Sequence, residues 1–164
     1  MHVVAEAHVP EDTHQRDDRW LADLLDQIWE QYFTDTPRVN RVRVSYGSAW
    51  KSRLGLITMS EDEKTSYIQV NSLLRHPEVP ENITFVTVAH EMVHYAHGFG
   101  SPLPRRYKHP HRGGVVKREL LRRGMSREYD LYDQWVYDSW YEFYAAWDAS
   151  LREAERAALG RATQ

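Results

Sequence analysis

The chain has 164 residues, of which 41% are hydrophobic and 27% are charged, and its net charge is −3. This length and balance predict one globular domain with its own core, and they exclude a mainly disordered chain. Cysteine is absent, which excludes disulfides, cysteine-ligated zinc and cysteine nucleophiles. No apolar run has the length of a membrane span and no signal peptide is evident, so we expect a cytoplasmic protein that does not enter membranes.

The first part of the chain divides into an arm and the start of a domain. Residues 1–16 are polar and are expected to form a flexible N-terminal arm, and residues 17–160 are expected to form the single domain. Apolar residues recur at helical spacing from Trp20 to Phe33, which predicts a first helix.

Three strands are predicted next, and together with the helices they indicate an α+β fold. The segments 42–46, 54–59 and 65–70 are rich in alternating apolar and β-branched residues. We expect them to form a small three-stranded antiparallel sheet in meander order. The acidic segment 61–64 is expected to join the last two strands as a hairpin.

Three helices are predicted after the sheet, one buried helix and two C-terminal helices. The first begins near Asn82, a candidate N-cap, and stops before Gly98. A shorter helix spans 115–123, and a long one begins near Ser126. An aromatic stripe marks the expected core-facing side of the last helix: Tyr132, Trp135, Val136, Trp140, Phe143, Tyr144, Trp147 and Leu151.

The segment His90–His94 has the sequence HEMVH and lies within the first of these three helices. Four residues advance a helix by about 400°, so His90 and His94 share one face and can bind one Zn²⁺ together. Glu91 lies beside that face, where it can take a proton from a water on the metal. The pattern predicts a hydrolytic zinc site with Glu91 as the catalytic base. The alternative is a buried helix with two hydrogen-bonded histidines and no metal.

A hydrolytic zinc site needs a third protein ligand and one position open to water. His97 lies about 10.5 Å along the helix axis from His90, too far to share one ion, and is expected beside the site. Two histidines in the following loop and two later glutamates also have suitable chemistry. The residue pattern leaves the third ligand open among His109, His111, Glu119 and Glu128.

A basic segment follows the histidine motif. Residues 105–127 hold seven arginines and two lysines, and Glu119 is the only acidic residue among them. Such a cluster is typical of a surface that binds a polyanion such as DNA. It is equally typical of a solvated helix face, and the sequence does not choose between the two interpretations.

Several segments together resemble the SprT-like metallopeptidase family. They are the aromatic end of the first helix at Tyr32-Phe33, the segment Ser52–Leu56, the strand and turn Ile68–Leu74, and the motif helix at 89–94. The resemblance covers roughly residues 20–124. In this family a loop histidine, followed by small residues and a short helix, supplies the third zinc ligand. The resemblance therefore implies that His111, which precedes Arg112-Gly113-Gly114, completes the site.

The resemblance implies a zinc-dependent peptidase in which His90, His94 and His111 bind Zn²⁺ and Glu91 is catalytic. Because the family includes a protease of DNA–protein crosslinks, it also implies substrates among DNA-associated proteins. We expect the strand at 65–70 to be an edge that pairs with an extended peptide. The candidates for stabilising the oxyanion remain Tyr95, Arg105, Tyr107 and Arg112.

Two other functions remain open on the sequence. One is a zinc-containing nucleic-acid-binding domain with little or no proteolysis, which would use residues 105–127. The other is a structural protein whose helix binds no metal. Glu91 favours the hydrolase, because a binding module has no need of a general base.

Overall fold

The computed structural model describes residues 15–163, so nearly all of the predicted arm lies outside the described residues. The fold is α+β, and the order of an N-terminal helix, a three-stranded sheet and then helices is as predicted. Helix α1 spans Asp18–Tyr32 and begins at Asp17, whose side chain accepts a hydrogen bond from the backbone N–H of Trp20. Its apolar face packs on the first strand and contains Leu21, Leu25, Ile28 and Trp29.

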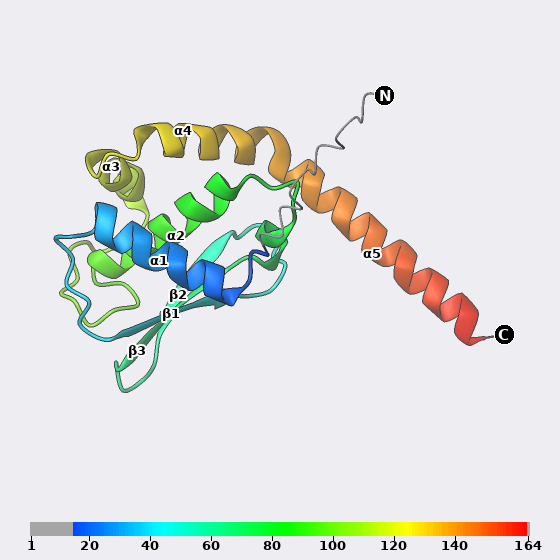
Figure 1. The fold of residues 1–164 in the computed structure, drawn as a ribbon, viewed down its shortest axis with the longest axis horizontal. Coiled ribbons are helices and arrows are strands. Elements are labelled where there is room, and N and C mark those ends of the chain that lie inside the picture. Colours follow the sequence, from blue (N-terminus) through cyan, green and yellow to red (C-terminus); the bar gives the residue numbers. More distant parts are fainter. Residues whose placement is uncertain (1–14, 164) are drawn as a thin grey trace, which may run out of the picture.

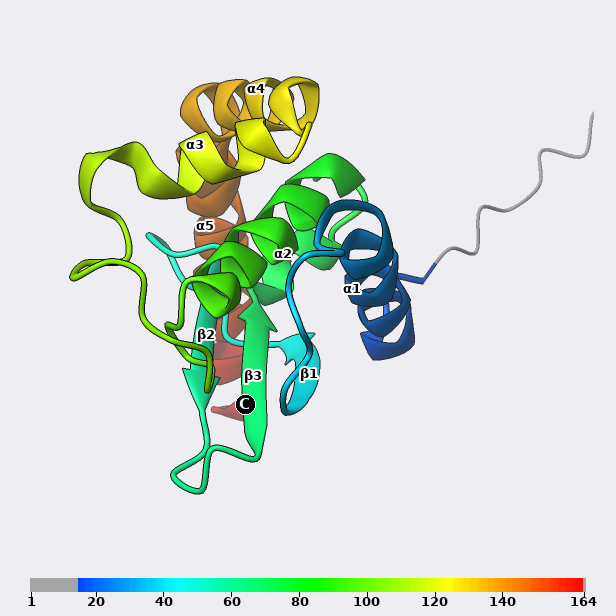
Figure 2. The ribbon, with the colours of Figure 1, turned by 90° about the vertical axis from the view of Figure 1, so that its left-hand side faces the viewer.

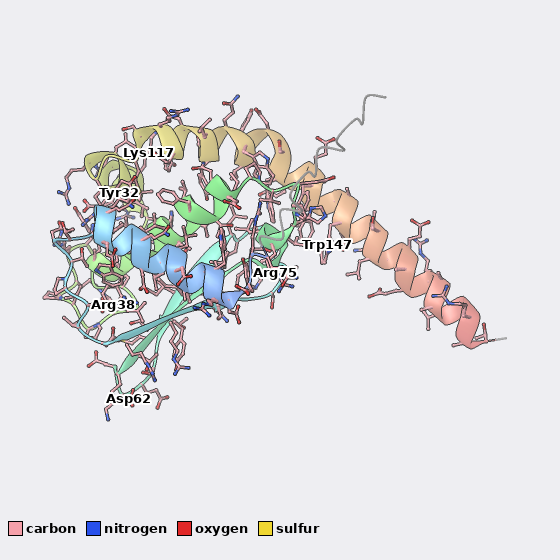
Figure 3. All side chains as sticks on the ribbon, viewed as in Figure 1. Tyr32, Arg38, Asp62, Arg75, Lys117 and Trp147 are labelled. Carbon is pink, nitrogen blue, oxygen red and sulfur yellow. The ribbon has the colours of Figure 1, made fainter. Side chains whose placement is uncertain are left out.

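The sheet contains β1 (Arg41–Tyr46), β2 (Gly55–Met59) and β3 (Thr65–Val70), in the order β1-β3-β2. The hairpin between β2 and β3 is antiparallel, as predicted. At its tip the Asp62 carboxylate accepts hydrogen bonds from the Ser60 hydroxyl and the Lys64 backbone (Figure 3). The predicted all-antiparallel meander is wrong, however, because β1 pairs with β3 in parallel.

The crossover between β1 and β2 explains this topology. The N–H of Gly47 donates to the carbonyl of Val70, and the N–H of Asn71 donates to the carbonyl of Leu54. The chain therefore passes over the end of β3 and starts β2 on the far side. The predicted edge role of 65–70 is also wrong, since β3 is central and β2 is an edge strand. Alternation in a sequence identifies strands but does not determine which strands pair.

Helix α2 (Glu81–Ala96) lies between the sheet and the C-terminal helices (Figure 2), and most of its side chains are buried. It begins one residue before the predicted N-cap Asn82, after Pro80. The Asn82 amide donates instead to the carbonyl of Glu128, which ties α2 to the next layer. The helix ends at a turn in which Gly98 has a φ of 82°, a conformation that favours glycine.

A short turn at Ser72–Arg75 precedes α2. Two C-terminal helices follow α2, as predicted. The first is α3 (Val115–Arg122). The second is long and consists of α4 (Ser126–Trp135), a π-helical turn at 136–140 and α5 (Tyr141–Ala162).

Helix α5 leaves the body of the protein near Trp147 and extends away from it (Figures 1 and 3). All residues from 149 to 163 are exposed. The prediction that Leu151 lies on the buried side of this helix is therefore wrong, because 41% of its surface is exposed. Within residues 15–163, no helix combines the length and the apolarity that crossing a membrane requires.

Candidate metal and catalytic site

Three histidines from two segments come together beside α2. His90 and His94 lie one turn apart on the helix, and His111 lies in the loop just before α3. The Nε2 atom of His94 is 3.1 Å from that of His90 and 2.9 Å from that of His111. The candidate ligand atoms of the three residues all lie within 4.8 Å of one another. The structure thus brings together the three residues that the sequence analysis proposed as ligands.

The donor set fits a zinc ion. Nitrogen ligands at tetrahedral positions around zinc lie about 3.3 Å apart, close to the separations found here. Metal binding also requires neutral imidazoles. Burial lowers the pKa of His90 to about 4, helped by the neighbouring His111. Burial likewise lowers the pKa of His94 to about 3. Both rings are therefore uncharged at neutral pH and can offer a lone pair to a cation.

Glu91 follows His90 on α2 and lines the same pocket as the three histidines. Its side chain is buried, with 5% of its surface exposed, and burial raises its pKa to about 8, against the opposing effect of Arg53. Gly55 at the start of β2 lies directly against it, because a Cβ on Gly55 would be 2.9 Å from the Glu91 Oε1 atom. A carboxyl group in this position can exchange a proton with a water molecule at the histidine cluster.

A pocket of about 500 Å³ opens over the three histidines and Glu91. It is lined by the edge strand β2 with the residues before it, by residues of the loop at 99–111, and by α4 with its π-helical turn. π-Helical turns often occur at functional sites. The lining side chains outside the histidine cluster include Arg53, Leu54, Phe99, Tyr132, Val136, Trp140 and Tyr141.

Hydrogen bonds fix the loop that leads into β2. The buried amide of Asn71 donates to the carbonyls of Trp50 and Arg53, both at 2.8 Å. From the other side, the indole N–H of Trp140 donates to the carbonyl of Lys51 at 2.7 Å. The segment from Trp50 to Leu54 is thereby held beside the pocket by Asn71, which follows β3, and by Trp140 of the π-helical turn.

The other candidate ligands lie elsewhere. His109 is exposed and outside the histidine cluster. His97 is fully buried, but its ring faces Tyr107 and the carboxylate of Glu119, with 3.9 Å between Nε2 and Oε2. Glu119 itself pairs with Arg122 and Arg123, away from the cluster. The backbone of Glu128 accepts the hydrogen bond of Asn82. The geometry thus favours His111 as the third ligand.

None of the four residues considered for oxyanion stabilisation lines the pocket. Tyr95 is buried in the core, where its hydroxyl donates to Asn40. Tyr107 packs on His97, Arg105 lies 4.8 Å above the Phe99 ring, and Arg112 is exposed.

Two pocket residues were not identified as functional from the sequence, Arg53 and Tyr132. Burial raises the pKa of Tyr132 to about 12, and its hydroxyl interacts with Thr87, one helix turn before Glu91. The segment Ser52–Leu56 was marked by the family resemblance, which was a signal for Arg53. Nothing in the pattern separated Tyr132 from its core-facing neighbours, because the core and the pocket border the same helix.

No known family model, curated protein or solved structure matches this chain.

Proposed function

We propose that this protein is a zinc-dependent metallopeptidase of the SprT-like type. One observation carries the proposal: the Nε2 atoms of His90, His94 and His111 converge beside the buried carboxyl of Glu91, in a pocket bordered by an edge strand. A structural histidine cluster has no need of the carboxyl group, the pocket or the edge strand together. The order of elements from α1 to α3 agrees with the family resemblance of the sequence.

Each residue has a distinct task in the proposed reaction. When bound, zinc supplies a Lewis acid that polarises the scissile carbonyl and lowers the pKa of a water molecule to about 7. Glu91 takes a proton from the attacking water and returns it to the leaving amine. We assign to Tyr132, which lines the pocket, the donation of a hydrogen bond to the developing oxyanion. The free edge of β2 offers backbone groups to an extended peptide.

Metal binding is the first expected result. The purified protein should bind about one equivalent of zinc, and His94→Ala should abolish binding, because a single lost ligand leaves the tetrahedral set incomplete. His111→Ala should weaken zinc binding far more than His109→Ala, which serves as the matched control in the same loop. Titration against a chelator measures both affinities. An equal effect of the two loop variants would remove His111 from the ligand set.

Proteolysis is tested with the zinc-loaded protein and unfolded casein. Cleavage that stops on chelation and returns with zinc supports the proposal. If the zinc-loaded protein cleaves neither casein nor DNA-bound histones, the peptidase function is excluded.

A zinc-containing nucleic-acid-binding domain is a second candidate. The loop that carries His111 also carries the exposed side chains of Arg105, Arg106, Lys108 and Arg112. Part of the basic segment is engaged within the protein, since Arg123 pairs with Glu119 and Asp35. The surface available to a polyanion is therefore smaller than the number of basic residues in 105–127 implies. We keep DNA-associated proteins as the proposed substrates.

Reversing three of the loop charges should weaken DNA binding. We expect Arg105→Glu, Arg106→Glu and Lys108→Glu together to flatten the salt dependence of single-stranded DNA binding, because each phosphate contact contributes about −0.7 to the log–log slope. Fluorescence anisotropy across a salt series gives that slope. The control reverses Arg19, Lys64 and Arg161, which are exposed on other elements. Equal slopes for the two triple variants would exclude this loop as the DNA contact.

A further inference from the structure

Arg53 stands out among the pocket residues that the proposed chemistry does not use. It is the only arginine or lysine among the described residues that line the pocket. Its guanidinium has no hydrogen-bond or ion-pair partner among the described residues, and its charge acts on Glu91. A permanent cation without a partner in a substrate pocket is a ready site for an anion.

The backbone around Arg53 is held firmly, which is what a specificity residue requires. The Asn71 amide binds the carbonyl of Arg53 itself, and the carbonyls of Trp50 and Lys51 are bound by Asn71 and Trp140. The N–H of Asn71 also donates to the carbonyl of Leu54. Because the backbone of this loop is already ordered, binding a ligand costs conformational freedom only in the Arg53 side chain.

The direction of β2 determines which part of a substrate reaches Arg53. Gly55 is the position of β2 that lies against Glu91, and Ile57 lies further along the strand in the same pocket. A peptide that pairs antiparallel to the free edge of β2 runs from Ile57 toward Gly55 and then toward Arg53. With the scissile bond beside Glu91, the residues that meet Arg53 are those after that bond.

We propose that Arg53 binds a carboxylate of the substrate on the C-terminal side of the scissile bond. The proposal rests on the proposed peptidase function and names its substrate class: peptides with an acidic side chain, or a free C-terminal carboxylate, shortly after the cleaved bond. Arginine matches a carboxylate with two parallel hydrogen bonds. Among residues 15–163, Glu91 is the only acidic side chain that lines the pocket and could oppose such a group.

The cleavage test uses a peptide library followed by matched peptides. Mass spectrometry of library products should show Asp, Glu or the free C-terminus within two residues after the cleaved bond. The best-cleaved sequence is then made with Glu or Gln at that position, and with a terminal acid or amide. We expect kcat/KM to favour the carboxylate about ten- to hundredfold, the range of a hydrogen bond to a charged group. The Glu/Gln pair and the acid/amide pair distinguish a side-chain carboxylate from a terminal one.

Arg53→Gln should remove this preference, Arg53→Lys should keep part of it, and the control Arg19→Gln should leave it unchanged. If wild type and Arg53→Gln share one preference, or neither prefers a carboxylate, the proposal is overturned.

A binding measurement tests carboxylate binding by Arg53 independently of catalysis. The zinc-loaded Glu91→Gln protein is titrated into two fluorescein-labelled decapeptides of Ala, Gly and Leu that differ only in three Glu or three Gln residues. We expect at least about tenfold tighter binding of the acidic peptide. This difference should disappear when Arg53→Gln is added. Absence of all cleavage would exclude the peptidase function, whereas equal binding of the two peptides would overturn the assignment of Arg53.

Discussion

Glu91→Gln is expected to lower the cleavage rate of the zinc-loaded protein by at least about 10²-fold, the scale of a lost general base. Glutamine keeps the shape of the side chain but cannot accept a proton from water. The variant should fold, because an uncharged amide of the same size suits a buried position. It should also keep its zinc, because the three histidines that converge at the site are unchanged.

The measurement combines initial rates on casein with elemental analysis of the same samples. Glu128→Gln is the matched control, since Glu128 lies on α4 and outside the pocket. Its rate should equal that of wild type. If Glu91→Gln retains zinc and turns over as fast as wild type, Glu91 has no role as a base. If it loses zinc while His111→Ala does not, the ligand assignment is wrong instead.

Asn71→Ala is expected to have the largest effect on stability, lowering the free energy of unfolding by about 2–4 kcal/mol. Asn71 is fully buried, and its side chain makes three hydrogen bonds. Two are donated to the carbonyls of Trp50 and Arg53, and one is accepted from the N–H of Leu73. Alanine leaves these groups without partners and releases the loop that lines the pocket.

Urea unfolding followed by tryptophan fluorescence measures this loss. Asn71→Asp is the graded control, because it keeps the acceptor for Leu73 but loses both donors. It should also destabilise the protein, because its buried carboxyl faces the carbonyls of Trp50 and Arg53 in place of the amide donor. A loss below about 1 kcal/mol for Asn71→Ala, near the contribution of one ordinary hydrogen bond, would mean that the loop does not depend on this amide.

Local periodicity predicted much of the fold. The helical spacing in α1 and the alternation in the three strands reflect which side chains face the core. This pattern can be recognised within a few neighbouring residues. The order of the strands was not predictable in this way. It depends on the crossover that Gly47 and Asn71 fix at the end of β3, a contact between segments far apart in the chain.

The residues of the site also fall into two groups, those that local spacing predicted and those that depend on distant contacts. His90, Glu91 and His94 share one helix, so their spacing alone placed them together. His111 needed the family resemblance as well, because loop conformation decides between it and His109. Tyr132 joins the pocket only because α4 packs on α2, which no local pattern records. Arg53 depends on the same kind of distant contact, through Asn71 and Trp140.

The exposed half of α5 has a different basis of stability from the rest of the protein. Its helical state beyond Trp147 depends on alanine-rich composition and on local pairs such as Asp148 with Arg152, since residues 149–163 are all exposed. Short helices without packing partners are marginal in water. The amide hydrogens of this segment should therefore exchange by local fraying, without the global opening that exposes α2. Motion at this end of α5 can occur while the histidine cluster keeps its geometry.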